Sequence, residues 1–151
     1  MILRRATEDD CAALEALQRA AYAENERILG ATPIPLQADY SAILRDMEVW
    51  LAGPRNDPDG ALVLEFRDSD MLIWSVATHP KARATGVGRG LLALAEKRAR
   101  DEKRGIIRLY TASLYLSNIE WYARHGFVEE SREAMSDRIR VNLIKKLDQG
   151  E

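Results

Sequence analysis

Residues 71–99 read MLIWSVATHPKARATGVGRGLLALAEKRA and predict a strand, a glycine-containing turn and a helix, in that order. The apolar and β-branched run that begins at Met71 is typical of a buried strand. We expect it to end near His79, because Pro80 has no N–H to donate to a sheet. After the turn, apolar residues recur at helical spacing at Leu91, Leu92, Ala95 and Ala99. The Lys-Arg-Gly sequence at 103–105 predicts the end of this helix.

The turn from Arg83 to Gly88 is suited to binding an anion, and a phosphate group is the expected ligand. The first turn of a helix presents unpaired N–H groups, and glycines let an anion approach the main chain. A nucleoside-triphosphate loop ends in Gly-Lys-Ser/Thr, whereas Gly88 is followed by Arg89 and Gly90. A dinucleotide-binding loop has the pattern G-x-G-x-x-G, and Leu91 occupies its third glycine position. A nicotinamide-dependent oxidoreductase therefore remains only a minor alternative.

Two stretches of the chain carry a family resemblance. The string from Thr78 to Gly88 resembles the acetyl-CoA loop of the GNAT N-acetyltransferase superfamily, in which a strand ending in V-x-P precedes R/Q-x-x-G-x-G/A. Residues 118–127 read NIEWYARHGF and are similar to the downstream GNAT signature, an Asn followed by Y-x-x-x-G-F. With the strands around them, the two stretches relate the chain from Trp50 to Leu147 to this family. The resemblance implies a GNAT-like acyl-CoA N-acyltransferase fold.

The resemblance also implies the cofactor, acetyl-CoA, with CoA as the product. The residues expected to bind it are Val76, Ala77 and Thr78 on the central strand, Arg83, Ala84, Thr85, Gly86, Val87 and Gly88 in the turn, and Asn118 in the following short helix. In the family the matching tyrosine, here Tyr122, protonates the thiolate that leaves. The spacing of four residues places Asn118 and Tyr122 on one face of a helix. Tyr122 is therefore the candidate catalytic residue, and a core tyrosine with its hydroxyl tied to the backbone is the alternative.

The sequence departs from better-known GNAT members at the general base. Some relatives carry a glutamate on the central strand where this chain has Leu72. Glu24, Glu26 and Glu65 are the remaining carboxylate candidates, and we rank removal of the proton through water above all three. A catalytically inactive acyl-CoA-binding sensor or interaction module is accordingly the alternative function.

The expected acceptor is a primary amine, either a small molecule or part of a peptide. Glu24, Glu26 and Asp39 flank the Pro-Ile-Pro loop at 33–35 and favour a cationic small amine. A peptide or protein amine stays open.

The remaining periodicities predict an α+β fold with one mixed, mostly antiparallel sheet and helices on both faces. We expect strands at 2–5, 48–52, 61–66, 106–111 and 138–147, a hairpin partner starting at 126–128, a helix from a Thr7/Asp10 cap to 24–27, a short helix over 40–44, and a helix that Ser117 and Glu120 begin with a capping box. The strand at 106–111 should lie parallel to the central strand, because a helix connects the two.

Length and composition limit the other possibilities. The 151 residues predict a single domain over 1–151, and the net charge of −2 argues against binding nucleic acid through bulk positive charge. No apolar run approaches the roughly 18 residues of a membrane span. A single cysteine, Cys11, fits a reducing, cytoplasmic compartment, and with only His79 and His125 besides, we expect no metal site. A homodimer is also expected.

Overall fold

The computed structural model describes residues 1–148, which form one seven-stranded sheet in the order β1-β2-β3-β4-β5-β7-β6. The strands are β1 (Leu3–Arg5), β2 (Glu48–Ala52), β3 (Gly60–Phe66), β4 (Met71–Thr78), β5 (Ile106–Ala112), β6 (Val128–Ala134) and β7 (Ile139–Lys146). The helices are α1 (Cys11–Leu29), α2 (Tyr40–Asp46), α3 (Val87–Asp101) and α4 (Leu116–Arg124), with short 3-10 helices η1 (Glu8–Asp10), η2 (Ile34–Leu36) and η3 (Pro80–Ala82). Only β4 and β5 pair in parallel, which confirms the mixed, mostly antiparallel sheet.

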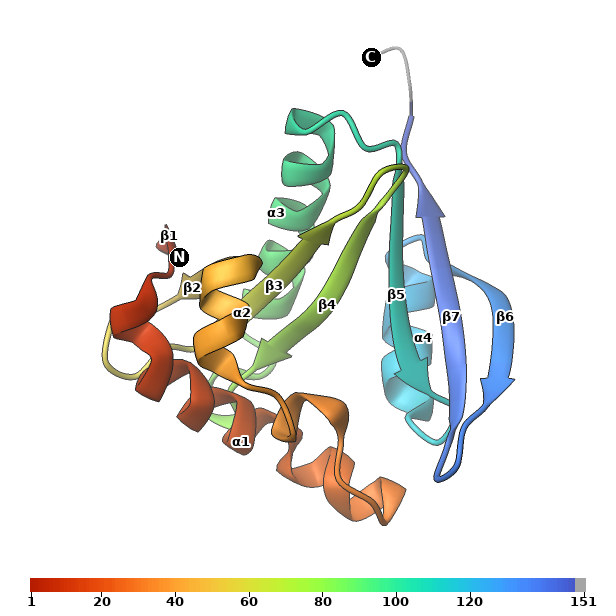
Figure 1. Cartoon of the computed structure of the whole chain (residues 1–151), viewed down its shortest axis with the longest axis horizontal. Helices are drawn as coiled ribbons and strands as arrows, with labels where there is room; N and C mark the ends of the chain where they lie inside the picture. The colour runs from red at the N-terminus through yellow and green to blue at the C-terminus, as the bar shows by residue number, and fades with distance from the viewer. Residues whose placement is uncertain (149–151) are drawn as a thin grey trace.

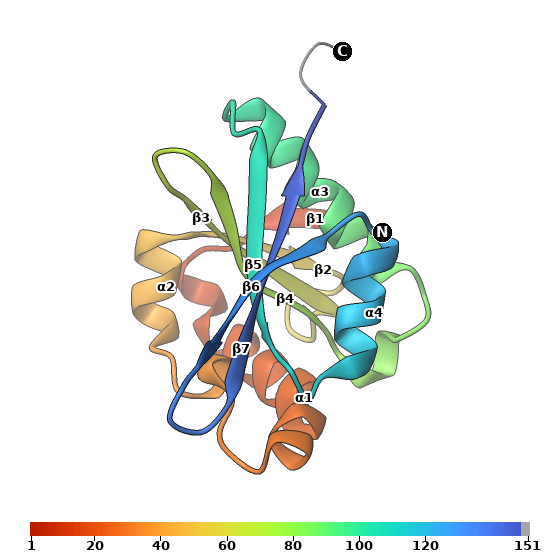
Figure 2. The same cartoon turned by 90° about the vertical axis from the view of Figure 1, so that its right-hand side faces the viewer.

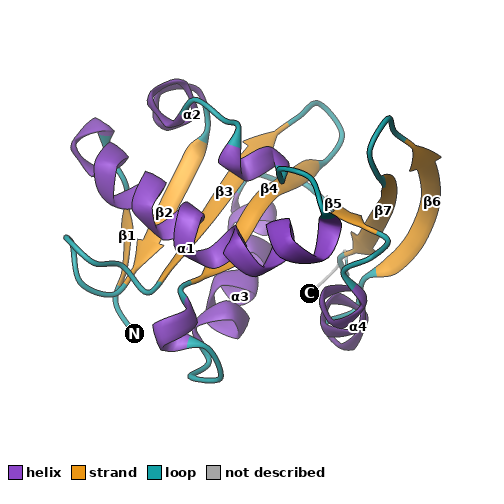
Figure 3. Cartoon of the chain, turned by 90° about the horizontal axis from the view of Figure 1, so that it is seen from below, coloured by secondary structure: helices purple, strands orange, loops and turns teal. Residues whose placement is uncertain are grey.

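The helices cover both faces of the sheet. In Figure 1, α1 and α2 lie in front of the strands and α3 and α4 behind them, and Figure 3 shows the same layers from below. Neighbouring residues of β3 face opposite layers, as the two-residue period of a strand requires. Leu64 packs in one apolar cluster with Leu91 of α3, and Val63 packs in the other with Leu14 of α1.

The parallel pair β4 and β5 separates partway along its length. Pairing begins at Met71 opposite Ile107 and ends at Ile73 opposite Leu109, although β4 continues to Thr78. The two ribbons diverge visibly below this point in Figure 1. Backbone groups on the β5 side of β4 are therefore left without β5 partners beyond Ile73.

A β-bulge lies where the separation begins. Val63 of β3 pairs with Ser75 and Leu64 pairs with Ile73, so Trp74 is an extra residue on β4. A bulge bends its strand and increases the local twist. The sequence pattern did not predict this bulge, which turns β4 away from β5.

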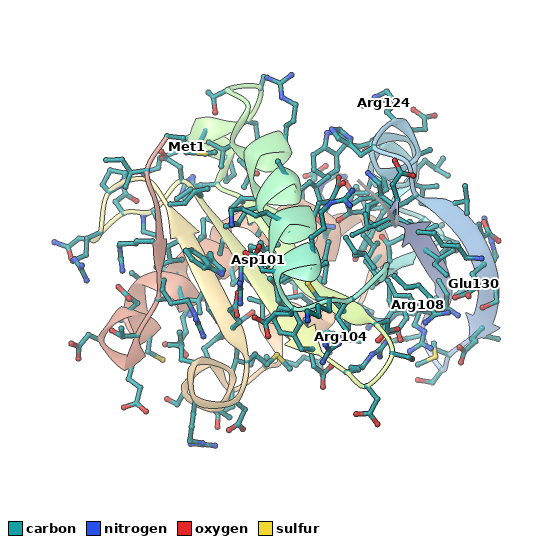
Figure 4. The ribbon with its side chains drawn as sticks, turned by 90° about the horizontal axis from the view of Figure 1, so that it is seen from above. Met1, Asp101, Arg104, Arg108, Arg124 and Glu130 are labelled. Atoms are coloured by element: carbon teal, nitrogen blue, oxygen red, sulfur yellow. The ribbon has the colours of Figure 1, made fainter. Side chains whose placement is uncertain are left out.

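Two arginines hold the closed end of the β4–β5 pair together. Arg104 donates from Nε to the carbonyl of Arg67, over 2.7 Å, across the turn between β3 and β4. Arg108 of β5 donates at 2.7 Å to the buried carboxylate of Asp70 and also pairs with Glu130 of β6. Figure 4 shows Arg108 beside Glu130, with Arg104 near the end of α3. The sheet therefore opens at one end only.

Two helix ends differ from the sequence predictions. Helix α1 runs to Leu29, past the predicted end at 24–27, and stops where Gly30 adopts a positive φ of 70°. Helix α3 ends at Asp101 because Lys103, with φ 59°, already leaves the helical region, so the predicted stop at Gly105 is wrong. The Thr7/Asp10 cap is confirmed by the N–H of Thr7, which donates to the Asp10 carboxylate at 2.9 Å.

The capping box predicted for α4 is wrong. The helix begins at Leu116 with Tyr115 as its N-cap residue, and no side chain caps it. Tyr115 is 9% exposed, and its hydroxyl donates to the carbonyl of Asn25 in α1 at 3.3 Å, so the residue before the helix is held by a tertiary contact. Ser117 therefore lies within the first turn of the helix.

Candidate functional site

A cavity of about 1030 Å³ lies where β4 and β5 separate. Its walls come from both layers of helices: α1 and residues 33–35 on one face of the sheet, and the turn before α3 together with α4 on the other. The turn between β6 and β7 adds Met135 and Arg138. The split between the strands thus joins the two faces in one chamber, which has the size of a pocket for a large ligand.

The turn before α3 presents a row of free backbone donors. Ala84 and Gly86 both have a positive φ, 63° and 90°, which turns successive N–H groups toward one side. Within residues 1–148, none of the backbone N–H groups from Ala84 to Arg89 donates to a protein acceptor. Together with the positive end of the α3 dipole, these donors have the geometry and charge that suit an anion such as a phosphate.

The structure brings together most of the residues predicted to bind the cofactor. The lining of the cavity includes Val76, Ala77, Thr78, Arg83, Ala84, Gly86, Gly88, Asn118 and Tyr122. The side chain of Val87 is instead buried in the apolar core, and the hydroxyl of Thr85 donates to the carbonyl of Ala82. The guanidinium of Arg83 donates to the carbonyl of Ala21 in α1 at 3.1 Å, so it ties the turn to the opposite layer of helices.

Tyr122 projects from α4 into the cavity. Its ring lies between those of Trp121 and Phe127, with centroids at 5.2 and 5.9 Å. Burial raises the pKa of the Tyr122 hydroxyl, so the group stays protonated at neutral pH. The hydroxyl has no hydrogen-bond partner among the residues that the structure describes, so it is not tied to the backbone as in an ordinary buried tyrosine. It is available to donate to a ligand.

A second tyrosine, which the sequence did not single out, lines the cavity from α1. The hydroxyl of Tyr22 lies 2.8 Å from Oγ of Ser75, and Gln18, one helical turn earlier, donates to the same Oγ at 3.0 Å. Burial raises the pKa of Tyr22, and Tyr22 in turn contributes to raising the pKa of Tyr122 across the cavity. The spacing of Gln18 and Tyr22 was the available signal, but their partner on β4 is more than 50 residues away in sequence.

The three carboxylates considered as general bases differ in their position relative to the cavity. Glu24 is the single carboxylate among the described residues of the lining, and Leu72 also lines the cavity. Arg27 holds the Glu24 carboxylate through two donated hydrogen bonds and lowers its pKa. Glu26 and Glu65 do not reach the cavity. No carboxylate of this site therefore has the raised pKa of a typical general base.

Two of the three acidic residues expected to favour a cationic acceptor, Asp39 and Glu26, form contacts outside the cavity. Asp39 caps α2 by accepting from the N–H groups of Ser41 and Ala42, and Glu26 accepts from the Thr32 hydroxyl. Neither lines the cavity. Of the three acidic residues, only Glu24 lines the cavity in the described part of the chain, and Arg27 is already paired with its carboxylate, so the support for a cationic small amine is reduced.

In contrast, five arginines line the cavity. Arg83, Arg89 and Arg124 lie in or beside the turn and α4, whereas Arg138 and Arg140 come from the β6–β7 turn and β7. The lining as a whole is more cationic than anionic, which suits negatively charged ligands.

Within residues 1–148, no group of three or more His, Cys, Asp or Glu side chains is placed to hold a metal ion. The helices in this part of the chain are too short or too polar to cross a membrane.

A family model described as an acetyltransferase (GNAT) domain matches residues 45–129, more than half of the chain. The match includes the turn before α3 and all of α4. No curated protein matches the sequence significantly.

Solved structures with the same fold cover nearly the full length of the chain. The ribosomal-protein-S18-alanine N-acetyltransferase from Escherichia coli has a TM-score of 0.79 at 13% identity and covers 99% of this chain and 96% of its own. The PaiA N-acetyltransferase from Thermoplasma acidophilum, in complex with coenzyme A, has a TM-score of 0.77 at 16% identity, covering 96% and 98%. The ribosomal-protein-alanine N-acetyltransferase from Brucella melitensis has a TM-score of 0.73 at 22% identity, covering 97% and 100%. At these identities the likeness concerns the fold.

Proposed function

The chain belongs to the GNAT acetyltransferase family, and from that premise we propose that it transfers an acetyl group from acetyl-CoA to a primary amine. One observation carries the proposal: the row of free N–H groups from Ala84 to Arg89 borders the same cavity as the unpaired end of β4. The free N–H groups suit a pyrophosphate, and the unpaired end of β4 suits an extended ligand that carries amide groups.

The residues present fit the parts of acetyl-CoA. The turn before α3 would bind the pyrophosphate through its backbone donors, with Arg89 adding positive charge beside them. The backbone of Val76 to Thr78 would pair with the pantetheine amides as if with another strand. Asn118, on the cavity side of α4, would hydrogen-bond to the same arm. Structures with CoA or acetyl-CoA bound exist among the neighbours of this fold, which supports this assignment.

Acetyl-CoA supplies a thioester, whose carbonyl carbon a neutral amine attacks directly while the C–S bond breaks. An unpaired N–H of β4 beside the bulge at Trp74 would polarise that carbonyl. The Tyr122 hydroxyl would donate a proton or a hydrogen bond to the departing sulfur, as its burial and free hydroxyl allow. Holding both reactants in one chamber contributes the largest part of the rate enhancement, and general acid assistance adds about 10² to 10⁴.

The amine loses its proton to water in this proposal. Leu72 occupies the position of the family's glutamate, and Glu24 is bound to Arg27. A neutral fraction of the amine always exists, at a cost of about 1.4 kcal/mol per pH unit below its pKa. No covalent enzyme intermediate is required.

The proposal also includes the domain organisation, the cellular location and the oligomeric state of the protein. One domain spans residues 1–151 and works in the cytoplasm, where Cys11 stays reduced. The protein forms a homodimer in this proposal, and its molar mass in solution, measured by light scattering, tests this.

The experiment that tests the function is a thermal-shift titration with acetyl-CoA, CoA and NAD side by side, followed by an amine screen that measures thiol release. A ligand that binds the native state stabilises it by RT ln(1 + [L]/Kd). We expect stabilisation by acetyl-CoA and CoA but not by NAD, and acetyl-CoA-dependent thiol release with at least one amine. Stabilisation by NAD alone overturns the proposal, and binding of acetyl-CoA without turnover of any amine favours the inactive binding module.

A further inference from the structure

The cavity has a second cationic region on the side of the sheet away from α3. We propose that Arg138 and Arg140 bind a carboxylate of the acceptor, so that the acceptor is an amino acid with a free carboxylate group. This inference rests on the proposed function and names the substrate class for the same site. It differs from the expectation of a cationic acceptor, for which Glu24, already paired with Arg27, is the one acidic residue of the described lining.

The geometry divides the five arginines of the lining into two groups. Arg83 and Arg89 belong to the turn that presents the free N–H groups, and Arg124 belongs to α4. Arg140 lies on β7 opposite Ala112, at the far end of β5 from the closed pair, and Arg138 lies two residues earlier. In the proposed function the first group lies on the cofactor side, where Arg89 adds charge beside the pyrophosphate and Arg83 ties the turn to α1. The second group is left for the other substrate.

Arg140 has unused hydrogen-bonding capacity inside the protein. Its guanidinium stacks on the ring of Tyr110, with Cζ 4.1 Å from the ring centroid, and one terminal nitrogen donates to Glu133 at 2.6 Å. Its Nε is buried and has no partner among the described residues. Its Nη1 also donates to no residue in the described part of the chain and, unlike Nε, is not buried, so this terminal nitrogen is the one that can reach a ligand carboxylate.

Arg138 closes the same end of the cavity. Its side chain is 11% exposed, and its Nη2 donates to the carbonyl of Thr32 at 3.0 Å, which ties the β6–β7 turn to the loop after α1. Asp137 accepts from Nε and Nη2, and Nη1 donates to no residue in the described part of the chain. The fixed, planar donors of arginine match the two oxygens of a carboxylate.

The surrounding walls fit the rest of an amino acid. Tyr110, Tyr115, Met135 and the loop residues Pro33 and Ile34 give this end of the cavity an aromatic and aliphatic surface. The carboxylates paired with the two arginines, Glu133 and Asp137, are about half exposed and do not line the cavity. A second positive charge on the acceptor is disfavoured here, whereas a carboxylate paired with arginine leaves the amine free to react. An apolar amino acid fits the apolar walls, supplies a carboxylate for the arginines and brings no second positive charge.

The test compares matched acceptors with acetyl-CoA at saturation. L-leucine, L-phenylalanine and L-methionine are assayed beside their methyl esters and decarboxylated amines, with spermidine as a polyamine. We expect the free acids to have kcat/KM about 10- to 100-fold above the esters and amines, the range of a charged hydrogen bond. Arg140→Gln should remove this preference by raising KM for the acids alone, and Arg140→Lys should restore part of it.

Arg132→Gln is the matched control, because Arg132 is also an arginine of the β6–β7 hairpin paired with a glutamate, Glu129, but does not line the cavity. It should leave every acceptor unchanged. Equal use of acids and esters, preference for spermidine, or equal losses for all acceptors in Arg140→Gln overturns the inference. Loss of CoA binding in Arg140→Gln also overturns it, because the residue then serves the cofactor.

A binding assay separates this inference from the proposed function. The same amino acids and esters are titrated into the protein by thermal shift, with and without CoA. Stabilisation by the acids and not by the esters, lost in Arg140→Gln, supports the carboxylate site even if no acetyl transfer occurs. Absence of this difference overturns the site even if some other amine is acetylated.

Discussion

The Tyr22 hydroxyl lies 2.8 Å from Oγ of Ser75, which joins α1 to β4 where β4 turns away from β5. Ser75 is 4% exposed, and its hydroxyl is shared by Tyr22 and the fully buried Gln18. This contact fixes one wall of the cavity against the strand proposed to hold the pantetheine arm. It also makes a prediction about stability that is independent of the proposed reaction.

Ser75→Ala should be more destabilising than Tyr22→Phe. In Tyr22→Phe, Ser75 keeps its bond to Gln18, so we expect a loss of about 1 kcal/mol. In Ser75→Ala, the buried Gln18 amide loses its partner and bears the cost of an unsatisfied group, about 1 to 3 kcal/mol. Urea unfolding of both variants measures the difference, and a larger loss in Tyr22→Phe would show that this network is not organised around Ser75.

Tyr122→Phe should lower turnover and leave cofactor binding intact. The substitution keeps the ring between Trp121 and Phe127 and removes only the free hydroxyl. We expect kcat to fall about 10²-fold, because the leaving sulfur loses its proton donor. Thiol-release kinetics and acetyl-CoA thermal shifts measure the two effects separately. Equal losses in kcat and affinity would identify Tyr122 as a packing residue.

Gly88→Val should abolish CoA binding with the fold retained. A Cβ at this position would lie 3.2 Å from Cζ2 of Trp121 and 3.3 Å from Oγ1 of Thr78, so a branched side chain must displace α4 or the turn. Ala93→Val, on the exposed face of α3, is the matched control and should bind CoA normally. Calorimetric titration measures the CoA affinity of both variants. An unchanged affinity in Gly88→Val would mean that the pyrophosphate binds elsewhere.

Asp10 should make the protein less stable in acid. Its carboxylate accepts two hydrogen bonds from Arg4, at 2.8 and 3.0 Å, and these lower the pKa of Asp10 to about 2. Because the folded pKa lies below the unfolded value of about 3.9, the stabilisation is complete above pH 4 and is lost as the pH falls toward 2. The contribution is about 2 kcal/mol at neutral pH.

Asp10→Asn tests this by removing the titrating group and keeping its shape. We expect the variant to be less stable than the wild type at pH 7, and the difference to shrink between pH 4 and pH 2. Urea denaturation at several pH values measures it. A difference that does not change with pH would show that the Arg4 contact stabilises the fold by packing alone.

Much of the site could be predicted from residues close in sequence. The strand, turn and helix at 71–99 and the stretch from Asn118 to Phe127 carry their pattern locally, and the structure places nearly all of the predicted cofactor-binding residues around one cavity. Tyr22 and Arg140 could not be found in this way. Tyr22 of α1 contacts Ser75 of β4, and Arg140 of β7 stacks on Tyr110 of β5, and no local sequence pattern predicts either contact between distant segments.

The α+β class, the places of the strands along the chain and the glycine turn before α3 could be read from the sequence, because apolar periodicity, proline and glycine act within a few residues. The separation of β4 and β5 after Ile73, the bulge at Trp74 and the start of α4 one residue before Ser117 became visible only in the folded structure. The same holds for the charges that meet in the cavity. These features depend on contacts between distant segments, whose geometry is set when the sheet and its two helical layers pack together.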